Sequence, residues 1–396
     1  MIDAAGFVAD LDRDLSVEDL YGKETVVNKK TGAVRQAGAE VNDTKHLELL
    51  RTRAEDSLYV FTKGVLARSY LIPRLHQPIA DFIQRTPPYR KLVLLPRRHG
   101  KTSLVSHGLP LHVIVQSKST NCYLPGVDGA DVRMLLVGET ERRAMDNLRV
   151  IQTVMEQNDL FRAFWPHRCW DNPQRQSKKW NERELLVPRE ATFPDPTIRA
   201  IGVGGAITGA RHDLHIKDDL ISVEAANSAV TMQGAIDWHI ASRALLDHDT
   251  SLEVTAGTRW AVHDLYSYIM QNDPSVAVML KGIIEDGKTI WPEAFSEARI
   301  QQLRAEFGVL FSLLYMNDPT DPALADFARE GLRFCTMTAN TISFYEDERD
   351  EALAAAMNRP KPRPDTQPLV PRGTVLNRYA IDELLVGRHE YLRFKY

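Results

Sequence analysis

The sequence is poor in cysteine and has no long run of apolar residues. Its three cysteines, Cys122, Cys169 and Cys335, lie far apart without CxxC spacing, which excludes a disulfide framework and a structural zinc site. We therefore expect a reducing, cytoplasmic setting. The N-terminus lacks the basic start and apolar core of a signal peptide, and about 18 consecutive apolar residues occur nowhere. These absences predict a soluble chain without a membrane span or a standard export signal.

A surplus of positive charge is also missing. The chain has 49 Lys and Arg against 53 Asp and Glu, a formal net charge of -4, which excludes a protein whose whole surface is a polycation. Any nucleic-acid contact must therefore be a local patch. With 396 residues, of which 43% are apolar, the chain is too long for one average domain and too apolar for a disordered one. We expect two or three packed units.

Strand-like and helix-like segments alternate through the middle of the chain. The strand-like runs cover 91–95, 134–138, 198–203 and 252–258, and helical spacing covers 71–84, the stretch after Gly100, and 141–156. This alternation predicts an α/β domain with a mostly parallel sheet flanked by helices. In the segment 141–156 one face carries the apolar residues Ala144, Leu148, Ile151 and Met155. That face predicts an outer helix packed on the sheet.

The two ends of the chain differ from this pattern. Residues 1–45 are polar and acidic and predict an accessory arm with a short hairpin or loop around Lys30 to Gly32. Residues 358–373 contain five prolines, which oppose both helix and central strand and predict an extended linker. The 23 residues beyond that run are too few for a domain.

A phosphate-binding loop is the first chemical motif. LLPRRHGKTS (94–103) follows an apolar strand and precedes a helical stretch, the context that GxxxxGK[ST] requires, although Leu95 stands at the first glycine position. Phosphate binding at such a turn needs backbone N–H groups at a helix N-terminus, a lysine ammonium and a hydroxyl for Mg²⁺. Gly100, Lys101 and Thr102 supply these groups, and we expect Lys101 to face solvent. The alternative is that Gly-Lys-Thr merely opens a surface helix.

Two arginines lie inside this loop. The Arg97 guanidinium could extend over the γ-phosphate as an arginine finger supplied by the same subunit, whereas Arg98 also fits a solvated basic turn. The whole loop is a candidate nucleotide site: Pro96, Arg97, Arg98, His99, Gly100, Lys101, Thr102 and Ser103.

A pair of adjacent carboxylates is the second motif. The segment GVGGAITGARHDLHIKDDLISVEA (202–225) runs from a glycine-rich turn to Asp218 and Asp219. The strand expected just before Asp218 is weakly indicated, because few of its residues are apolar. A nucleotide hydrolase needs one carboxylate for the magnesium shell and a second to orient the attacking water. Asp218 and Asp219 suit these two roles, while a surface turn is the alternative. Glu139 and Glu224 remain rival carboxylates.

With these motifs assembled, five separated segments over about residues 71–330 resemble the ATPase part of large terminase subunits, the DNA-packaging motors of tailed bacteriophages. Gln77 in LHQPIADFI resembles the adenine-contact element, and LPRRHGKTS resembles the terminase phosphate loop, with Arg97 at its arginine position. The other segments are GGAITGARHDLHIKDDLIS, the coupling motif LEVTAGTRWAVHDL (252–265), and WPEAFSEARIQQLRAEFGVLFSLLYMNDPTDP (291–322).

The resemblance implies a P-loop ATPase of the ASCE type that uses ATP and Mg²⁺. In it Lys101 would hold the phosphates, Thr102 and Asp218 the magnesium, Asp219 the attacking water, and Arg97 the transition-state charge. The domains would be an accessory arm (1–45), an ATPase subdomain (46–255), a lid or coupling subdomain (256–345) and a proline-rich linker (346–396). Asp219 departs from the family, in which this acid is often the longer Glu.

The same resemblance implies the partners and the place of action. We expect double-stranded DNA, a portal protein, a small terminase subunit and further copies of the chain in a ring, in the host cytoplasm and transiently at the portal vertex of the procapsid. Such subunits usually continue into a two-metal nuclease. We expect that half to be absent, truncated or supplied elsewhere, because Asp382 reads as an ordinary exposed residue rather than as a nuclease carboxylate. We therefore expect no endonuclease activity from this chain.

Two further sites are less defined. Residues 162–189 carry seven Lys or Arg against three acids, with tryptophans interleaved, and Arg175, Lys178 and Lys179 are candidate DNA contacts, or part of a solvated loop. Thr258 and Arg259 could sense the γ-phosphate, or Arg259 could simply pair with Asp264. A helicase-like translocase and a non-hydrolytic assembly protein with a vestigial nucleotide site are the rival functions.

Overall fold

The computed structural model describes residues 44–319, apart from 86, 88, 207, 208 and 249, together with the backbone of six short strands outside this range. The chain divides into two compact units, Met1–Pro319 and Thr320–Tyr396. None of the helices in the described part of the chain has the length and apolar character needed to cross a bilayer.

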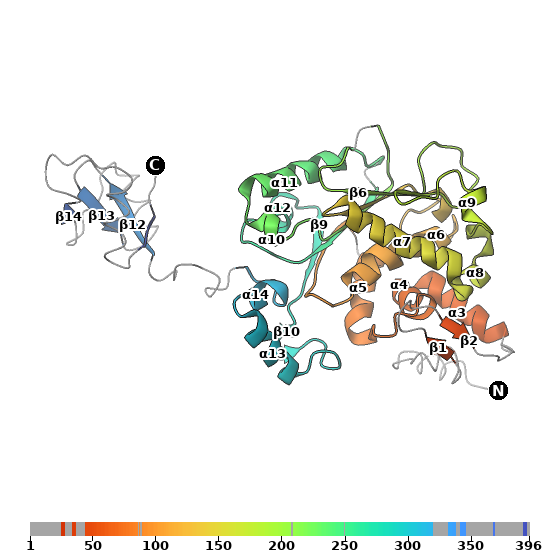
Figure 1. Cartoon of the computed structure of the whole chain (residues 1–396), viewed down its shortest axis with the longest axis horizontal. Coiled ribbons are helices and arrows are strands. Elements are labelled where there is room, and N and C mark those ends of the chain that lie inside the picture. Colours follow the sequence, from red (N-terminus) through yellow and green to blue (C-terminus); the bar gives the residue numbers. More distant parts are fainter. Residues whose placement is uncertain are drawn as a thin grey trace. The chain divides into compact units, whose positions relative to one another are not determined.

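A seven-stranded sheet forms the centre of the first unit (Figure 1). Across the sheet its strands are β5 (Glu184–Leu185), β6 (Ile198–Gly202), β4 (Met134–Gly138), β7 (Leu214–Asp218), β8 (Leu252–Gly257), β3 (Arg90–Leu94) and β9 (Val276–Leu280). All neighbours pair parallel except β5 and β6. The predicted mostly parallel α/β sheet is confirmed, and β7 forms although its sequence is only weakly strand-like.

Helices cover both faces of this sheet, because strand side chains alternate between the two sides. Leu92 and Leu94 pack on one face, whereas Val93 and Leu95 pack on the other. The face with Val93 is covered by α3 (Thr44–Asp56), α4 (Leu58–Val60), α5 (Pro73–Arg85), α6 (Leu109–Val115), α7 (Glu141–Gln157) and α8 (Asp159–Phe164). The face with Leu92 is covered by α10 (Val223–Ala226), α11 (Ala229–Arg243) and α12 (Leu265–Asn272).

The outer helix α7 shows how the sequence specifies these layers. It begins after Thr140, whose side chain accepts a hydrogen bond from the Arg143 N–H and so caps the helix N-terminus. The predicted apolar face is buried as expected, with Ala144 and Leu148 both inaccessible to solvent. The prediction of an outer helix on the sheet is therefore confirmed.

The end of the first unit lies beside the phosphate loop. After β9 the chain forms the hairpin β10 (Ile284–Glu285) and β11 (Lys288–Thr289), then α13 (Glu297–Phe307) and α14 (Leu310–Leu314). The boundary expected at residue 255 falls inside β8, and β9 extends the same sheet to residue 280. The sheet thus runs on into the segment that the sequence suggested as a lid.

The backbone described outside this core is limited to short strands. β1 (Thr25–Val27) and β2 (Val34–Gln36) form the hairpin expected in the N-terminal arm. In the second unit, β14 (Gln367–Pro368), β13 (Thr341–Tyr345), β12 (Leu332–Met337) and β15 (Tyr391–Arg393) make a four-stranded sheet. The segment 346–396, expected to be a linker, thus contributes β14 and β15 to a sheet, while Asp382 lies outside the described residues.

Candidate functional site

The candidate site lies where β3, β8, β7 and β4 end at one edge of the sheet. Because these strands are parallel and in register, Leu94 is paired with Gly257, and Asp218 is paired with both Ala256 and Gly138. A cavity of about 440 Å³ opens at this edge. It is lined by Tyr70, Pro96, Arg97, Arg98, His99, Gly100, Lys101, Thr102, Ser103, Glu139, Arg143, Asp219, Ile221, Ser222, Thr258 and Trp260.

The phosphate loop forms the turn between β3 and a helix that runs from 101 to 115. Gly100 has φ +76°, and a Cβ on it would lie 3.1 Å from Leu71 and 3.2 Å from His76, so the position requires glycine. The first N–H groups of the following helix have no partner within the helix, which suits them to bind an anion. The turn therefore has the backbone form expected of a phosphate loop.

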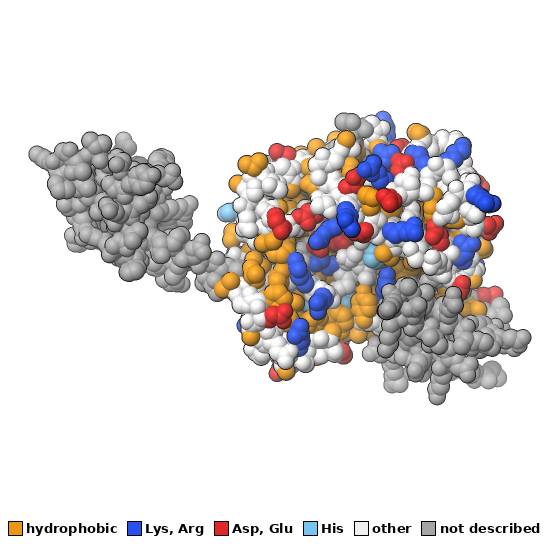
Figure 2. Space-filling model, in the orientation of Figure 1, with side chains coloured by type: hydrophobic (Ala, Val, Ile, Leu, Met, Phe, Trp, Pro, Cys, Tyr) orange, Lys and Arg blue, Asp and Glu red, His pale blue; other side chains and the backbone are white. Residues whose placement is uncertain are grey.

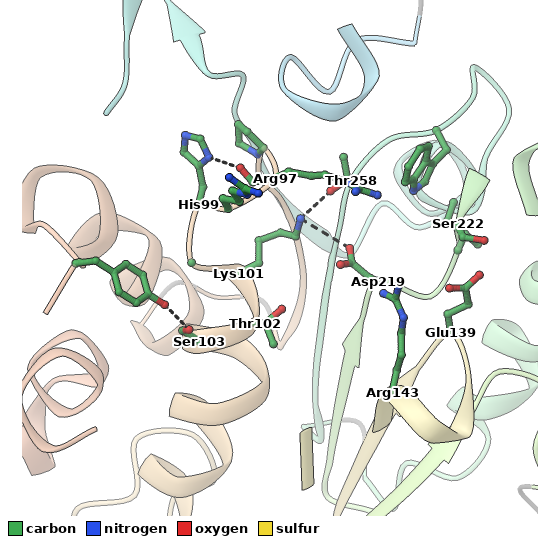
Figure 3. Close-up of a pocket in the computed structure, with 16 residues that line it drawn as sticks. Arg97, His99, Lys101, Thr102, Ser103, Glu139, Arg143, Asp219, Ser222 and Thr258 are labelled. Carbon is green, nitrogen blue, oxygen red and sulfur yellow. Dashed lines mark hydrogen bonds and ion pairs between the residues drawn. The ribbon is translucent and has the colours of Figure 1, made fainter. Parts of the chain in front are cut away.

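Lys101 is held at the centre of the site (Figure 3). Its ammonium donates to the Thr258 hydroxyl at 2.7 Å and to the Leu95 carbonyl at 3.2 Å, and lies 3.7 Å from Asp219 Oδ1. The expectation that Lys101 faces solvent is wrong, because its side chain is only 7% exposed. Thr258 directly follows β8 and lies beside the loop. The sequence alone does not reveal its hydrogen bond with Lys101.

Asp218 ends β7 and is buried. Ser106, one helical turn beyond Thr102, donates to its Oδ2 at 2.7 Å, whereas its Oδ1 is buried without a hydrogen-bond partner. Burial and the neighbouring carboxylate of Asp219 raise the pKa of Asp218 to about 6, and the hydrogen bond from Ser106 and the charge of Lys101 oppose this rise. The unpartnered oxygen is the natural position for a cation ligand, since buried polar atoms are otherwise satisfied.

Asp219 turns from the end of β7 into the cavity. Its φ is +45°, an unusual conformation for a residue with a side chain, and its N–H donates to the Ala256 carbonyl at 2.9 Å. The rival Glu139 also lines the cavity at the end of β4, whereas Glu224 is exposed and is not among the lining residues. Asp219 and Glu139 are therefore the two carboxylates that open directly onto the cavity.

These residues fit a nucleotide with magnesium. The helix N-terminus and Lys101 suit phosphates, and the orphaned Oδ1 of Asp218, near the Thr102 hydroxyl, suits a cation. Among the described residues, no three His, Cys, Asp or Glu side chains are grouped to hold a metal by themselves. A magnesium site needs no such group, because Mg²⁺ is usually held by one or two carboxylates and completes its shell with water and substrate phosphates.

The other residues of the loop contact chain segments that follow β8 and β9. The Arg97 N–H donates to the Leu314 carbonyl at 3.0 Å, and its guanidinium lies 5.1 Å from the Trp260 ring at the cavity. The His99 ring stacks on Phe295 at 4.8 Å. Burial lowers the pKa of His99 to about 4, so the ring is neutral at pH 7. Arg98 lines the cavity with φ +65°.

Two sequence candidates lie differently from the rest. Gln77 is exposed on α5 and is not among the residues that line the cavity. Arg259 forms an ion pair with Asp264 at 2.9 Å and also donates to the Ala261 and Val262 carbonyls, so its guanidinium is occupied away from Lys101. Of the suggested coupling pair, only Thr258 contacts Lys101.

Several side chains in the basic segment 162–189 are already bonded to other residues of the protein. Arg168 is buried against Asp128, and the Trp170 and Trp180 ring N–H groups donate to Leu186 and Glu156. Lys179 pairs with Glu184 at 3.4 Å, whereas the side chains of Arg175 and Lys178 are exposed without a partner among the described residues. On the face of the first unit in Figure 2, basic and acidic side chains are interspersed. DNA contact by Arg175, Lys178 and Lys179 stays a prediction.

Several residues of the site were not predicted from the sequence, among them Tyr70, Ser106 and Arg143. The Tyr70 hydroxyl is bonded to the Ser103 hydroxyl, and Arg143 reaches the cavity from the first turn of α7 (Figure 3). Helical spacing is a signal for Ser106, which lies four residues after Thr102 in one helix. It is no signal for Arg143, because Glu139 precedes the N-cap of α7. No pattern marks Tyr70, which precedes α5 in an irregular stretch.

Comparison with known proteins returns matches only among solved structures. No protein-family model matches the sequence, and no curated protein matches it. The large terminase of bacteriophage HK97 matches with a TM-score of 0.40 and 15% identity, covering 77% of this chain. The chain spans only 55% of the length of that terminase.

Two structures of the large terminase of a thermophilic bacteriophage also match, one of them in complex with ADP. Both have a TM-score of 0.36 and 11% identity and cover 81% of this chain, with 80% and 81% of the respective terminase chains. The family that the sequence motifs resemble is thus also the family of these matched structures.

Proposed function

We propose that this chain is an ATP-hydrolysing motor that moves double-stranded viral DNA into a procapsid, as the large subunit of a terminase. One observation carries the proposal: Lys101 lies between Thr258 and Asp219 at the sheet edge where the phosphate-loop helix begins. The motifs that resemble terminases give the direction of the proposal, and the geometry of the cavity supports its chemistry.

Each residue has a role in this proposal. The N–H groups around Gly100 and the ammonium of Lys101 would bind the phosphates, while Thr102 and Asp218 would hold magnesium. When bound, Mg²⁺ neutralises charge on the phosphate oxygens. Asp219 orients and accepts a proton from the attacking water, and the Arg97 guanidinium stabilises charge that develops on the γ-phosphate.

The partners and location belong to the same proposal. The motor would act on duplex DNA in the host cytoplasm, docked transiently as a ring on a portal protein, with a small terminase subunit delivering the DNA. Arg175 and Lys178 are exposed cations that could contact the DNA backbone without reading base sequence. A nuclease activity is not part of the proposal.

The decisive experiment measures phosphate release from ATP by the purified chain with Mg²⁺, with and without duplex DNA. We expect turnover that Lys101→Met and Asp219→Asn each reduce by at least about 10³, because Lys101 binds the transferring phosphoryl group and Asp219 orients the attacking water. The matched controls Lys118→Met and Asp237→Asn, at exposed positions, should hydrolyse like the parent. Nucleotide binding without turnover by the parent would instead favour the vestigial site of an assembly protein.

A second assay separates the motor from a helicase. A translocase on duplex DNA should displace a third strand from a triplex in an ATP-dependent manner while leaving a forked duplex intact. Separation of the forked strands would favour a helicase-like function and would overturn the proposal of a packaging motor.

A further inference from the structure

Tyr266 on α12 contacts the turn that carries Asp219, although neither the motifs nor the cavity lining includes it. Its side chain is fully buried, and its hydroxyl accepts a hydrogen bond from the Leu220 N–H at 3.1 Å. This tyrosine thus contacts the backbone immediately after the proposed water-orienting carboxylate. It does so from α12, the helix that begins at the last residue of the coupling motif.

The turn at Asp219 needs such support. A positive φ at a residue with a side chain costs free energy and persists only where surrounding contacts determine it. Two consecutive N–H groups are held here. The Asp219 N–H donates to the Ala256 carbonyl of β8, and the Leu220 N–H donates to Tyr266. The two peptide units that flank Asp219 are therefore each held by one hydrogen bond.

The end of β8 is shaped to admit the tyrosine. A Cβ on Gly257 would lie 2.1 Å from Tyr266 Cζ and 2.2 Å from its hydroxyl oxygen, distances that no side chain tolerates. Only glycine lets the phenol ring pass beneath the strand end to the turn at Leu220. Burial, together with the nearby Asp219 and Asp264 carboxylates, raises the pKa of Tyr266, so the hydroxyl stays protonated.

We propose that Tyr266 is a positioning residue: its hydroxyl fixes the turn at Leu220 and so keeps the Asp219 carboxylate directed at the cavity and Lys101. The inference rests on the proposed ATP hydrolysis. Without the hydroxyl, the peptide unit after Asp219 is released, so Asp219 can rotate about its N–Cα bond toward ordinary negative φ values, and the carboxylate turns with it. The ring would still fill the core between β8 and α11, where Tyr266 packs with Ile236 and Trp238.

The first test does not depend on activity. Tyr266→Phe keeps the ring and removes only the hydroxyl, and hydrogen exchange is followed by mass spectrometry on peptides that span residues 214–224. We expect the Leu220 amide to exchange at least about tenfold faster, because its only acceptor is lost. Tyr123→Phe is the matched control, since the Tyr123 hydroxyl is equally buried and bonds to His112 Nδ1 at 2.7 Å, away from this turn.

The second test follows ATP turnover in the same variants. Tyr266→Phe should lower kcat about tenfold while KM and nucleotide affinity stay within about twofold, because Lys101 and the phosphate loop are untouched. Tyr123→Phe should lose comparable stability and keep the parent kcat. Gly257→Ala, which displaces the ring, should reproduce the faster exchange at Leu220 if Tyr266→Phe folds poorly.

The outcomes separate the inference from the function on which it rests. A parent chain that never hydrolyses ATP contradicts the proposed function, and the exchange rate at Leu220 then decides the role of Tyr266 alone. Unchanged exchange at Leu220 overturns the inference, as does an active parent whose Tyr266→Phe variant turns over ATP at the parent rate. A fall in kcat shared equally by Tyr123→Phe also overturns it, since the effect would then be one of general stability.

Discussion

The Lys101 ammonium lies 2.7 Å from the Thr258 hydroxyl, so the phosphate loop after β3 is bonded directly to the residue that follows β8. Both side chains are buried, with Thr258 only 3% exposed. A hydrogen bond to a charged group in such a position contributes about 1.5–3 kcal/mol. The position of the lysine is therefore determined by two neighbouring strands together.

Replacing the Thr258 hydroxyl tests this link. Valine has nearly the same shape as threonine, so Thr258→Val removes the acceptor hydroxyl with little change in packing. Lys101 then retains its contacts with the Leu95 carbonyl and Asp219. We expect kcat for ATP to fall about 10- to 100-fold, the range that one charged hydrogen bond supplies, and nucleotide affinity to change less than about threefold. Thr153→Val, on the exposed side of α7, is the control. Parent-like turnover by Thr258→Val would show that this contact is dispensable.

The Ser106 hydroxyl should control how Asp218 holds magnesium. Ser106→Ala removes the donor at Oδ2 and lets the carboxylate rotate, so we expect the Mg²⁺ concentration for half-maximal nucleotide binding to rise about tenfold or more. Ser106→Thr keeps the hydroxyl and should bind like the parent. Ser242→Ala removes a buried hydroxyl that accepts from Lys217 instead, and it should leave the magnesium dependence unchanged.

Arg97 is expected to act on the nucleotide of its own subunit. Its guanidinium lies at the cavity beside Trp260, and loss of an arginine finger typically lowers turnover by roughly 10³ to 10⁵ with little change in affinity. Arg97→Ala should therefore bind ATP and fail to hydrolyse it. Mixing Arg97→Ala with Lys101→Ala subunits is informative, because rescued hydrolysis in the mixture would mean that the finger reaches a neighbouring subunit.

Buried histidines predict a specific loss of stability in acid. His112 is fully buried and bonded to the Tyr123 hydroxyl, and burial lowers its pKa to about 4 from 6.5. Because the unfolded chain binds the proton first, this contribution to stability is complete above pH 6.5 and is lost as the pH falls toward 4. Between pH 7.5 and 5.5 we expect His112 to account for about 1.3 kcal/mol of the fall in unfolding free energy.

Urea titrations at the two pH values measure this loss. The difference in unfolding free energy between pH 7.5 and 5.5 should shrink by about 1.3 kcal/mol in His112→Gln relative to the parent. His248→Gln is the control, since the His248 side chain is 70% exposed. An equal pH difference in the parent and in His112→Gln would contradict the assignment.

The sequence predicts the sheet and the phosphate loop well because both depend on local patterns. Runs such as 134–138 are apolar throughout, as strands buried on both faces must be, and Gly100 meets the requirement of a tight turn before a helix. β7 was harder to predict, since Lys217 and His215 read as polar. Lys217 is buried all the same, because Glu253 on β8 accepts a charged hydrogen bond from it. The His215 ring is buried in its neutral form, since burial lowers its pKa.

The rest of the site depends on contacts between segments far apart in the chain. Lys101 and Thr258 are separated by 157 positions, and nothing local to either residue reveals their hydrogen bond. The same holds for Tyr266, whose ring fits only because Gly257 lacks a side chain. Conversely, Gln77 has the right motif position but an exposed side chain on α5, since helical rotation directs its neighbours Leu75 and Ile79 inward.

The central place of β8 gives this site an uneven tolerance to genetic change. β8 pairs with both β3 and β7, so its register sets the distance from Lys101 to the acidic pair through backbone hydrogen bonds. Substitutions of similar volume at the apolar positions Leu252, Val254 and Ala256 leave that spacing intact. Insertion or deletion of one residue there would shift Thr258 along the strand and reverse which side chains face each layer. Homologues of this protein should therefore differ in their apolar residues within 252–256 but keep the length of this segment.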